Sequence, residues 1–155
     1  EMSEFRILKI LKTNVLGPIL CAKHAVLRMS PRHGGQGGSI VNVSSVAARL
    51  GSPGEYVDYA ASKGAVKMLT KGMCADWAKY GIQANGLAPG YFATEMNKAL
   101  VENEEFSAWL CKRTPAGRWG QVDELNGAAI FLASDASSFI NGQVIYVDGG
   151  MTSCV

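Results

Sequence analysis

The chain has 155 residues, of which 48% are hydrophobic and 18% charged, and these are ordinary values for one globular domain with a buried core. Its net charge of +2 is too small to favour nucleic-acid binding, and no apolar run reaches the ~18 residues of a membrane span. The four cysteines are scattered without a Cys-x-x-Cys spacing. We therefore expect a cytoplasmic protein with reduced thiols, no metal site, and neither a nucleic-acid nor a membrane partner.

The chain opens with an amphipathic helix predicted from about Ser3 to Met29, because apolar residues recur there at three- and four-residue steps. A start inside such a helix leads us to expect a piece of a longer chain, although Met2 leaves a start codon open as the alternative. Gly17-Pro18 interrupts the pattern. Local sequence favours a simple helix break; the alternative is a kink in which the carbonyl of Asn14 loses its helical donor to Pro18.

Strands and helices alternate along the rest of the chain, which predicts right-handed crossovers and a parallel sheet. Segment 91–121 is less regular and is expected to form a substrate lid in which Trp109 and Trp119 are packing residues. The expected elements are a turn-rich loop at 31–38, a strand at 39–43, a loop at 46–55, a helix at 56–79, a strand at 82–88, a helix at 122–134 and a strand at 143–147.

Tyr59 and Lys63 lie one helical turn apart on the predicted 56–79 helix, so their side chains share a face. A lysine ammonium about 5 Å from a phenol favours the phenolate by roughly 3 kcal/mol at an effective dielectric of ~20. A serine hydroxyl beside that phenol can hold a substrate oxygen. The pattern indicates proton transfer to or from an alcohol or carbonyl oxygen.

The Tyr-x-x-x-Lys spacing alone is weak, because it arises by chance in roughly one chain in four of this composition. Its context strengthens it. Ser44-Ser45 and Pro89-Gly90 each follow a predicted strand, and Asn14 lies on the interrupted helix before them. Parallel sheets bind ligands at the carboxyl ends of their strands, where these residues are expected to gather.

With these residues in place, the chain resembles the C-terminal part of the classical short-chain dehydrogenases/reductases. The matching stretches follow the family's order and cover nearly the whole chain. From about Met73 onward it further resembles gluconate 5-dehydrogenases, particularly over 101–111, whereas the earlier segment is more similar to generic sugar or glucose dehydrogenases. The matching stretches are TNVLG at 13–17, IVNVSS at 40–45, YAASKG at 59–64, Asn85 with PGYFAT at 89–94, PAGRWG at 115–120, NGQ at 141–143 and VDGG at 147–150.

The resemblance implies roles for individual residues. Tyr59 would exchange the hydroxyl proton, Lys63 would promote the phenolate and bind the nicotinamide ribose, and Ser45 would orient and polarise the substrate oxygen. Asn14 would hold a water that relays protons from Lys63. The implied cofactor-binding residues are Tyr59, Lys63, Pro89, Gly90 and Thr94.

Two features depart from the family pattern. The spacing from Ser45 to Tyr59 is one residue longer than the commonest one, so Ser44 stays open as an alternative to Ser45, which we favour. The family's Gly-rich turn after its first strand, and the residue that chooses NAD or NADP, do not occur in the sequence. The glycines of 34–38 do not replace that turn, because they precede a strand, whereas a dinucleotide loop follows one.

We therefore expect an α/β fold, a partial Rossmann-type parallel sheet with flanking helices, in which 1–155 is the C-terminal catalytic part of a single domain that lacks its cofactor-binding part. The expected activity is NAD- or NADP-dependent interconversion of a secondary alcohol and a ketone, on a sugar acid or polyol such as gluconate/5-ketogluconate. One alternative is a 3-oxoacyl-thioester reductase-like enzyme; another is a non-catalytic fragment that acts only in association. The isolated chain is expected to be inactive, and the complete protein a homo-oligomer, either a dimer or a tetramer.

Overall fold

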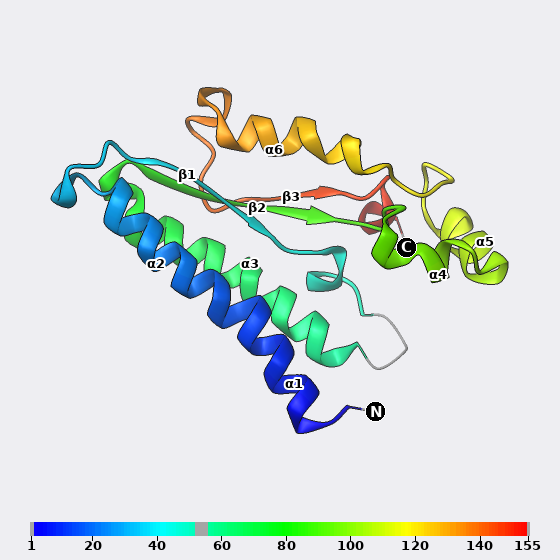
Figure 1. Cartoon of the computed structure of the whole chain (residues 1–155). Helices are drawn as coiled ribbons and strands as arrows, with labels where there is room; N and C mark the ends of the chain where they lie inside the picture. The colour runs from blue at the N-terminus through cyan, green and yellow to red at the C-terminus, as the bar shows by residue number, and fades with distance from the viewer. Residues whose placement is uncertain (1, 52–55, 155) are drawn as a thin grey trace.

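Helices cover both faces of a three-stranded parallel sheet in the computed structural model, which describes residues 2–51 and 56–154 (Figure 1). The strands β1 (Gly38–Val43), β2 (Ile82–Pro89) and β3 (Val144–Val147) follow one another in the order β1-β2-β3. All three strands and the parallel α/β arrangement confirm the prediction. The expected loop at 46–55 is described only as far as Gly51, and its remainder lies outside the described residues.

The two faces of the sheet carry different helices. Helices α2 (Gly17–Met29) and α3 (Val57–Trp77) pack on one face, whereas α6 (Asn126–Ala133) packs on the other. Figure 1 shows α1 (Glu4–Leu11) continuing the line of α2 so that it lies beside the beginning of α3. The short helices α4 (Lys98–Val101) and α5 (Glu104–Arg113) lie beyond the carboxyl ends of the strands.

The first helix passes through Pro18 without breaking, so the favoured prediction of a helix break was wrong. Residues Lys12–Leu16 form a π-helical turn, in which the N–H of Gly17 donates to the carbonyl of Lys12, five residues earlier. Proline has no N–H and its ring clashes with the carbonyl four residues before it, so a wider turn lets the helix continue. The alternative, a freed Asn14 carbonyl, stays a prediction.

Two hydrophobic clusters hold these elements together. Under the sheet, Ala84 of β2 packs with Met73 of α3 and Ala22 of α2. Beyond the strand ends, Leu110 of α5 packs with Trp119 and Met151, and all three side chains are buried. The second cluster fixes the segment that follows β2 against the segment that follows β3, and so it shapes the edge where the strands end.

The glycine loop before β1 is a structural turn. Gly37 has a φ of +82°, and a Cβ there would come 2.3 Å from the carbonyl oxygen of Gly81. Gly38 donates its N–H to that same carbonyl. These glycines therefore allow a close backbone crossing at the amino end of β1, at the opposite end of the strand from Ser44-Ser45.

The described residues give no sign of a membrane span or a resident metal. None of the helices in 2–51 and 56–154 is long and apolar enough to cross a membrane. No group of three or more His, Cys, Asp or Glu side chains suited to a metal ion occurs in that part of the chain. All four cysteines are free thiols.

Candidate active site

The two serines that follow β1 are bonded differently. The Ser44 side chain is buried, and its hydroxyl donates to the carbonyl of Lys63 at 3.0 Å. The hydroxyl oxygen of Ser45 instead accepts the N–H of Ala47 at 3.2 Å, as the N-cap of the 3-10 turn Val46–Ala48. An accepting hydroxyl keeps its own proton to donate, so the bonding of Ser45 leaves a donor at the strand end, whereas that of Ser44 joins β1 to α3.

Tyr59 and Lys63 lie on one face of α3, as the helical period predicts. The Nζ of Lys63 is 5.7 Å from the centroid of the Tyr59 ring and donates to the carbonyl of Val43 at 3.0 Å. Burial lowers the pKa of the Lys63 ammonium from its ordinary value. Because an ammonium carries three N–H groups and one is used on Val43, Lys63 keeps donors for a ligand at the end of β1.

Asn14 reaches the same helix through a residue that the sequence did not single out. The Asn14 side chain lies on the π turn and donates from Nδ2 to the hydroxyl of Ser62 at 3.0 Å. Ser62 is fully buried, and its hydroxyl donates to the carbonyl of Tyr59 at 2.7 Å. The structure thus brings Asn14 to the turn that carries Tyr59 and Lys63. Only the position of Ser62 beside Lys63 in the sequence could have drawn attention to it.

The remaining predicted cofactor residues follow β2 along the same edge of the sheet. Gly90 donates its N–H to Val147 at 2.9 Å, and a Cβ on Gly90 would lie 2.8 Å from Cα of Asp148. Pro89 is the last residue of β2. Thr94 is the N-cap of the next turn, where its hydroxyl oxygen accepts the N–H of Asn97 at 3.3 Å.

Asp148, after β3, supports this edge and was not among the predicted site residues. Its carboxylate accepts the N–H groups of Gly150 and Thr152, each at 2.9 Å. Burial raises the pKa of Asp148, but hydrogen bonds from Thr152 and Gly150, with the nearby charge of Arg49, outweigh it and lower the pKa overall. The ionised carboxylate holds the turn that packs against Gly90.

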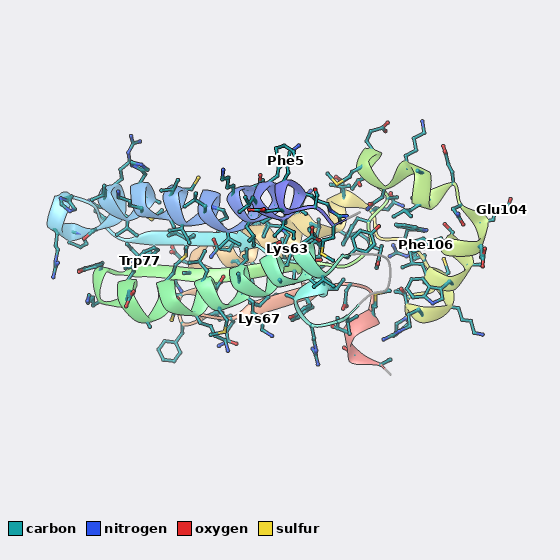
Figure 2. All side chains as sticks on the ribbon, turned by 90° about the horizontal axis from the view of Figure 1, so that it is seen from below. Phe5, Lys63, Lys67, Trp77, Glu104 and Phe106 are labelled. Atoms are coloured by element: carbon teal, nitrogen blue, oxygen red, sulfur yellow. The ribbon has the colours of Figure 1, made fainter. Side chains whose placement is uncertain are left out.

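Aromatic rings pack within segment 91–121, whose role as a lid stays a prediction. Tyr91 meets Phe106 and Trp119 edge-on, with ring centroids 5.8 Å and 5.9 Å apart, and Trp119 donates from Nε1 to Ser107 at 3.1 Å. Trp109 is half exposed and packs beside Phe106 with a centroid distance of 5.4 Å. Trp119 is therefore a packing residue, as expected, whereas for the half-exposed Trp109 the same role stays a prediction. Figure 2 labels Phe106 at the end of the molecule that α5 occupies and Lys63 near its middle.

A small cavity lies between segment 91–121 and the end of β3. Its volume is about 80 Å³, and its lining includes Tyr91, Thr114 and Asp148. Such a volume admits water-sized groups. The carboxyl edge of the sheet thus combines a phenol, an ammonium and a hydroxyl with the packed segment 91–121, an arrangement suited to moving a proton on an oxygen atom.

Comparison with protein families and solved structures agrees with this arrangement. Residues 1–152 match the family model described as enoyl-(acyl carrier protein) reductase. The chain is 58% identical over 143 residues to the gluconate 5-dehydrogenase of Gluconobacter oxydans, covering 92% of this chain and 54% of that protein. It is 60% identical over 118 residues to the 5-keto-D-gluconate 5-reductase of Escherichia coli, covering 76% of this chain and 46% of that protein.

A crystal structure of a gluconate 5-dehydrogenase from Burkholderia cenocepacia, in complex with NADP and tartrate, superposes with a TM-score of 0.94 at 58% identity. The match covers 99% of this chain and 59% of that one. The chain therefore spans about half of the length of the curated relatives it matches.

Proposed function

Because the chain belongs to the short-chain dehydrogenase/reductase family, we propose that it is the C-terminal catalytic part of a Rossmann-type NAD(P)-dependent oxidoreductase that interconverts a secondary alcohol and a ketone. We propose a sugar acid as substrate, with gluconate/5-ketogluconate as the first candidate, since relatives at 58% and 60% identity carry names of that activity. The observation that carries the proposal is the Lys63 ammonium, 5.7 Å from the Tyr59 ring at the end of β1.

The donor set at the carboxyl edge fits the nicotinamide end of such a cofactor. Lys63 keeps N–H groups for ribose hydroxyls, and Pro89-Gly90 presents backbone with no bulky side chain beyond β2. Thr94 lies further along the same edge. When bound, the nicotinamide supplies or accepts the hydride, while the protein supplies position and the proton.

The proton step follows from the arrangement of α3 and β1. In the reducing direction, the Tyr59 hydroxyl donates its proton to the carbonyl oxygen of the substrate, while Ser45 donates a hydrogen bond to that same oxygen. The positive charge of Lys63 stabilises the phenolate that forms at Tyr59. In the oxidising direction the phenolate takes the proton back. We assign Asn14 the support of this turn through Ser62, with the family's proton-relaying water as its second role.

The bonding of the two serines supports Ser45 over Ser44 as the residue that touches substrate. Ser44 is buried and already donates to Lys63. Ser45 accepts a backbone N–H and so keeps its proton for the substrate oxygen.

We also propose that the complete protein is a homo-oligomer. The outer surface of the first helix exposes apolar side chains, among them Phe5, Leu16 and Leu20. Figure 2 shows Phe5 on α1 pointing away from the body of the molecule. Apolar surface of this kind marks protein contacts. Sedimentation of the full-length protein would measure its size, and a monomer at micromolar concentration would contradict this proposal.

The decisive experiment replaces Tyr59 by Phe in the full-length protein and follows NAD(P)H at 340 nm with 5-ketogluconate. We expect turnover to fall by about a thousandfold or more, because the phenol supplies the proton in the transition state. NADPH affinity, measured by fluorescence titration, should change little. Wild-type turnover in Tyr59→Phe would contradict the assignment.

A substrate panel completes the experiment. The wild-type protein is assayed with both nucleotides on gluconate, 5-ketogluconate, galactitol and a 3-oxoacyl thioester. Preference for the sugar acids supports the proposal. Preference for the thioester replaces it with the alternative reductase, and no turnover with any of them favours a non-catalytic role.

A further inference from the structure

A buried ion pair joins the first helix to the turn that carries Tyr59. The Nε of Arg6 lies 3.1 Å from Oδ2 of Asp58, and a second guanidinium nitrogen of Arg6 donates to Oδ1 at 3.5 Å. Arg6 lies on α1 and Asp58 is the second residue of α3. Figure 1 shows these two helical ends side by side.

The environments of the two partners are unequal. The Asp58 side chain is 1% exposed, whereas that of Arg6 is 33% exposed. Within the described part of the chain, Oδ2 of Asp58 has no well-aligned hydrogen bond, so the Arg6 charge is its main compensation. A carboxylate is left so deeply buried only where it is paired, because desolvation of an isolated charge is costly.

Asp58 also holds the backbone of its neighbour. Its Oδ1 accepts the N–H of Tyr59 at 2.8 Å, one of the first N–H groups of α3, which have no partner inside the helix. One carboxylate thus fixes the first turn of α3 from inside and links it to α1. The carbonyl of Tyr59 is bonded in turn to Ser62, so the backbone of Tyr59 is held at both its N–H and its C=O.

We propose that Arg6 and Asp58 are positioning residues for the proton donor: the pair orients the turn that carries Tyr59 and balances the charge around its phenol. The inference rests on the proposed function, in which Tyr59 exchanges the proton. Neither residue touches substrate. Asp58 acts through the Tyr59 backbone, and Arg6 acts by neutralising Asp58.

Charged side chains on α3 and on the elements packed against it come from three elements. Helix α3 supplies Asp58 and Lys63, and α1 supplies Arg6. The turn after β1 ends at Arg49, which lies over the Tyr146 ring on β3. In this proposal Arg6 offsets the charge of Asp58, the residue before Tyr59. Without Arg6 the buried Asp58 anion would oppose phenolate formation, whereas loss of Asp58 would leave the Arg6 charge to favour it.

The test uses four variants of the full-length protein: Arg6→Met, Asp58→Asn, the double variant and the rescue Arg6→Lys. Asp58→Asn keeps an acceptor for the Tyr59 N–H and removes only the charge. Arg28→Met, at the exposed far end of α2, removes the same charge as a matched control. Two readouts are used. The first is the pH profile of kcat. The second is the absorbance change on phenolate formation as the pH is raised, measured for each variant and for the same variant carrying Tyr59→Phe, so that the difference reports Tyr59 alone.

We expect the single variants to shift the titration midpoint in opposite directions by about half a pH unit, upward for Arg6→Met and downward for Asp58→Asn. The double variant should return to the wild-type midpoint, and both Arg6→Lys and Arg28→Met should stay there. In Arg6→Met, kcat should fall about tenfold while KM for the nucleotide changes less than about twofold, because neither Arg6 nor Asp58 is among the proposed cofactor-binding residues.

Shifts in the same direction, or none, would overturn the electrostatic role, because loss of fold alone cannot give opposite signs. Unchanged kcat in all variants would overturn the positioning role. An inactive wild type would count against the proposed function instead, and the absorbance titration, which needs no turnover, would still decide the inference. Far-UV circular dichroism of each variant identifies any that fail to fold. If Arg6→Met does not fold, the downward shift expected for Asp58→Asn decides the inference.

Discussion

Adjacent residues with the same hydroxyl serve different purposes at the end of β1. The proton of Ser44 is committed to the Lys63 carbonyl inside the protein, whereas Ser45 accepts a backbone N–H and faces the strand end. The Ser44 hydroxyl thus bonds into α3, whereas the Ser45 hydroxyl caps the turn that follows β1. The roles of the two are therefore separable by substitution.

Ser45→Ala should lower kcat by about a hundredfold, because in the proposed mechanism its hydroxyl donates to the substrate oxygen. The loss of this cap of a short turn should lower the free energy of unfolding by only about 0.5 kcal/mol. Ser44→Ala should lower the free energy of unfolding by about 1 kcal/mol, because the buried hydrogen bond from the Ser44 hydroxyl to the Lys63 carbonyl is lost, and should retain most activity. Steady-state kinetics and urea unfolding of the two variants measure this contrast. The reverse pattern would move the substrate contact to Ser44.

At the scale of elements, the Arg118–Glu124 ion pair lies at the turn just before α6, the helix that covers the second face of the sheet. Glu124 meets Arg118 at 2.7 Å and accepts the N–H of Gln121, the N-cap of the turn before α6. The hydrogen bonds from Arg118 and from the backbone of Gln121 lower the pKa of Glu124 to about 2. Both groups are solvent-exposed, so the pair is a local brace rather than a large source of stability.

Glu124→Gln should lower the melting temperature at pH 7 by a small amount, on the order of 1–2 °C. The stabilisation by Glu124 is complete above its ordinary pKa near 4.5 and is lost as the pH falls towards about 2, because the depressed pKa belongs to the folded state. Melting curves of wild type and variant between pH 7 and pH 2 check this. The two curves should converge at the acid end, and a constant difference would contradict the assignment.

The elements were predictable from the sequence where their signals are local. Turn residues bound each strand, and the helical period by itself places Tyr59 and Lys63 on one face. The π turn was not predictable, because Gly17-Pro18 has the same local signature whether a helix ends, kinks or widens. Arg6–Asp58 and Asn14–Ser62 each join residues far apart in sequence, and a local pattern carries no information about which distant side chains meet.

On the scale of the whole molecule, the described residues supply one edge of a binding site rather than a closed one. The family's Gly-rich strand-to-helix turn has no counterpart in the sequence, and the glycines of 34–38 serve a backbone crossing instead. A dinucleotide gains much of its affinity from such a turn, where backbone N–H groups and a helix N-terminus hold the pyrophosphate.

The 155-residue chain alone should therefore bind NADH and NADPH only weakly, with dissociation constants in the millimolar range or above. Titration of the nucleotide fluorescence against the chain measures this, with the full-length protein as the positive control. Micromolar binding by the isolated chain would show that the carboxyl edge and its lid suffice as a cofactor site.

The π turn at Lys12–Leu16 also acts as a rotational setting for everything before it. Each residue of an α-helix advances the chain by about 100° around the axis and about 1.5 Å along it. If the same residues of this turn, with none deleted, wound as a regular α-helix, α1 would be rotated by about that angle. Arg6 would then point to a different side of the helix and lose its contact with Asp58, although neither residue had been changed. The winding of the first helix, residue by residue, thus determines whether Arg6 can reach Asp58, the residue next to Tyr59.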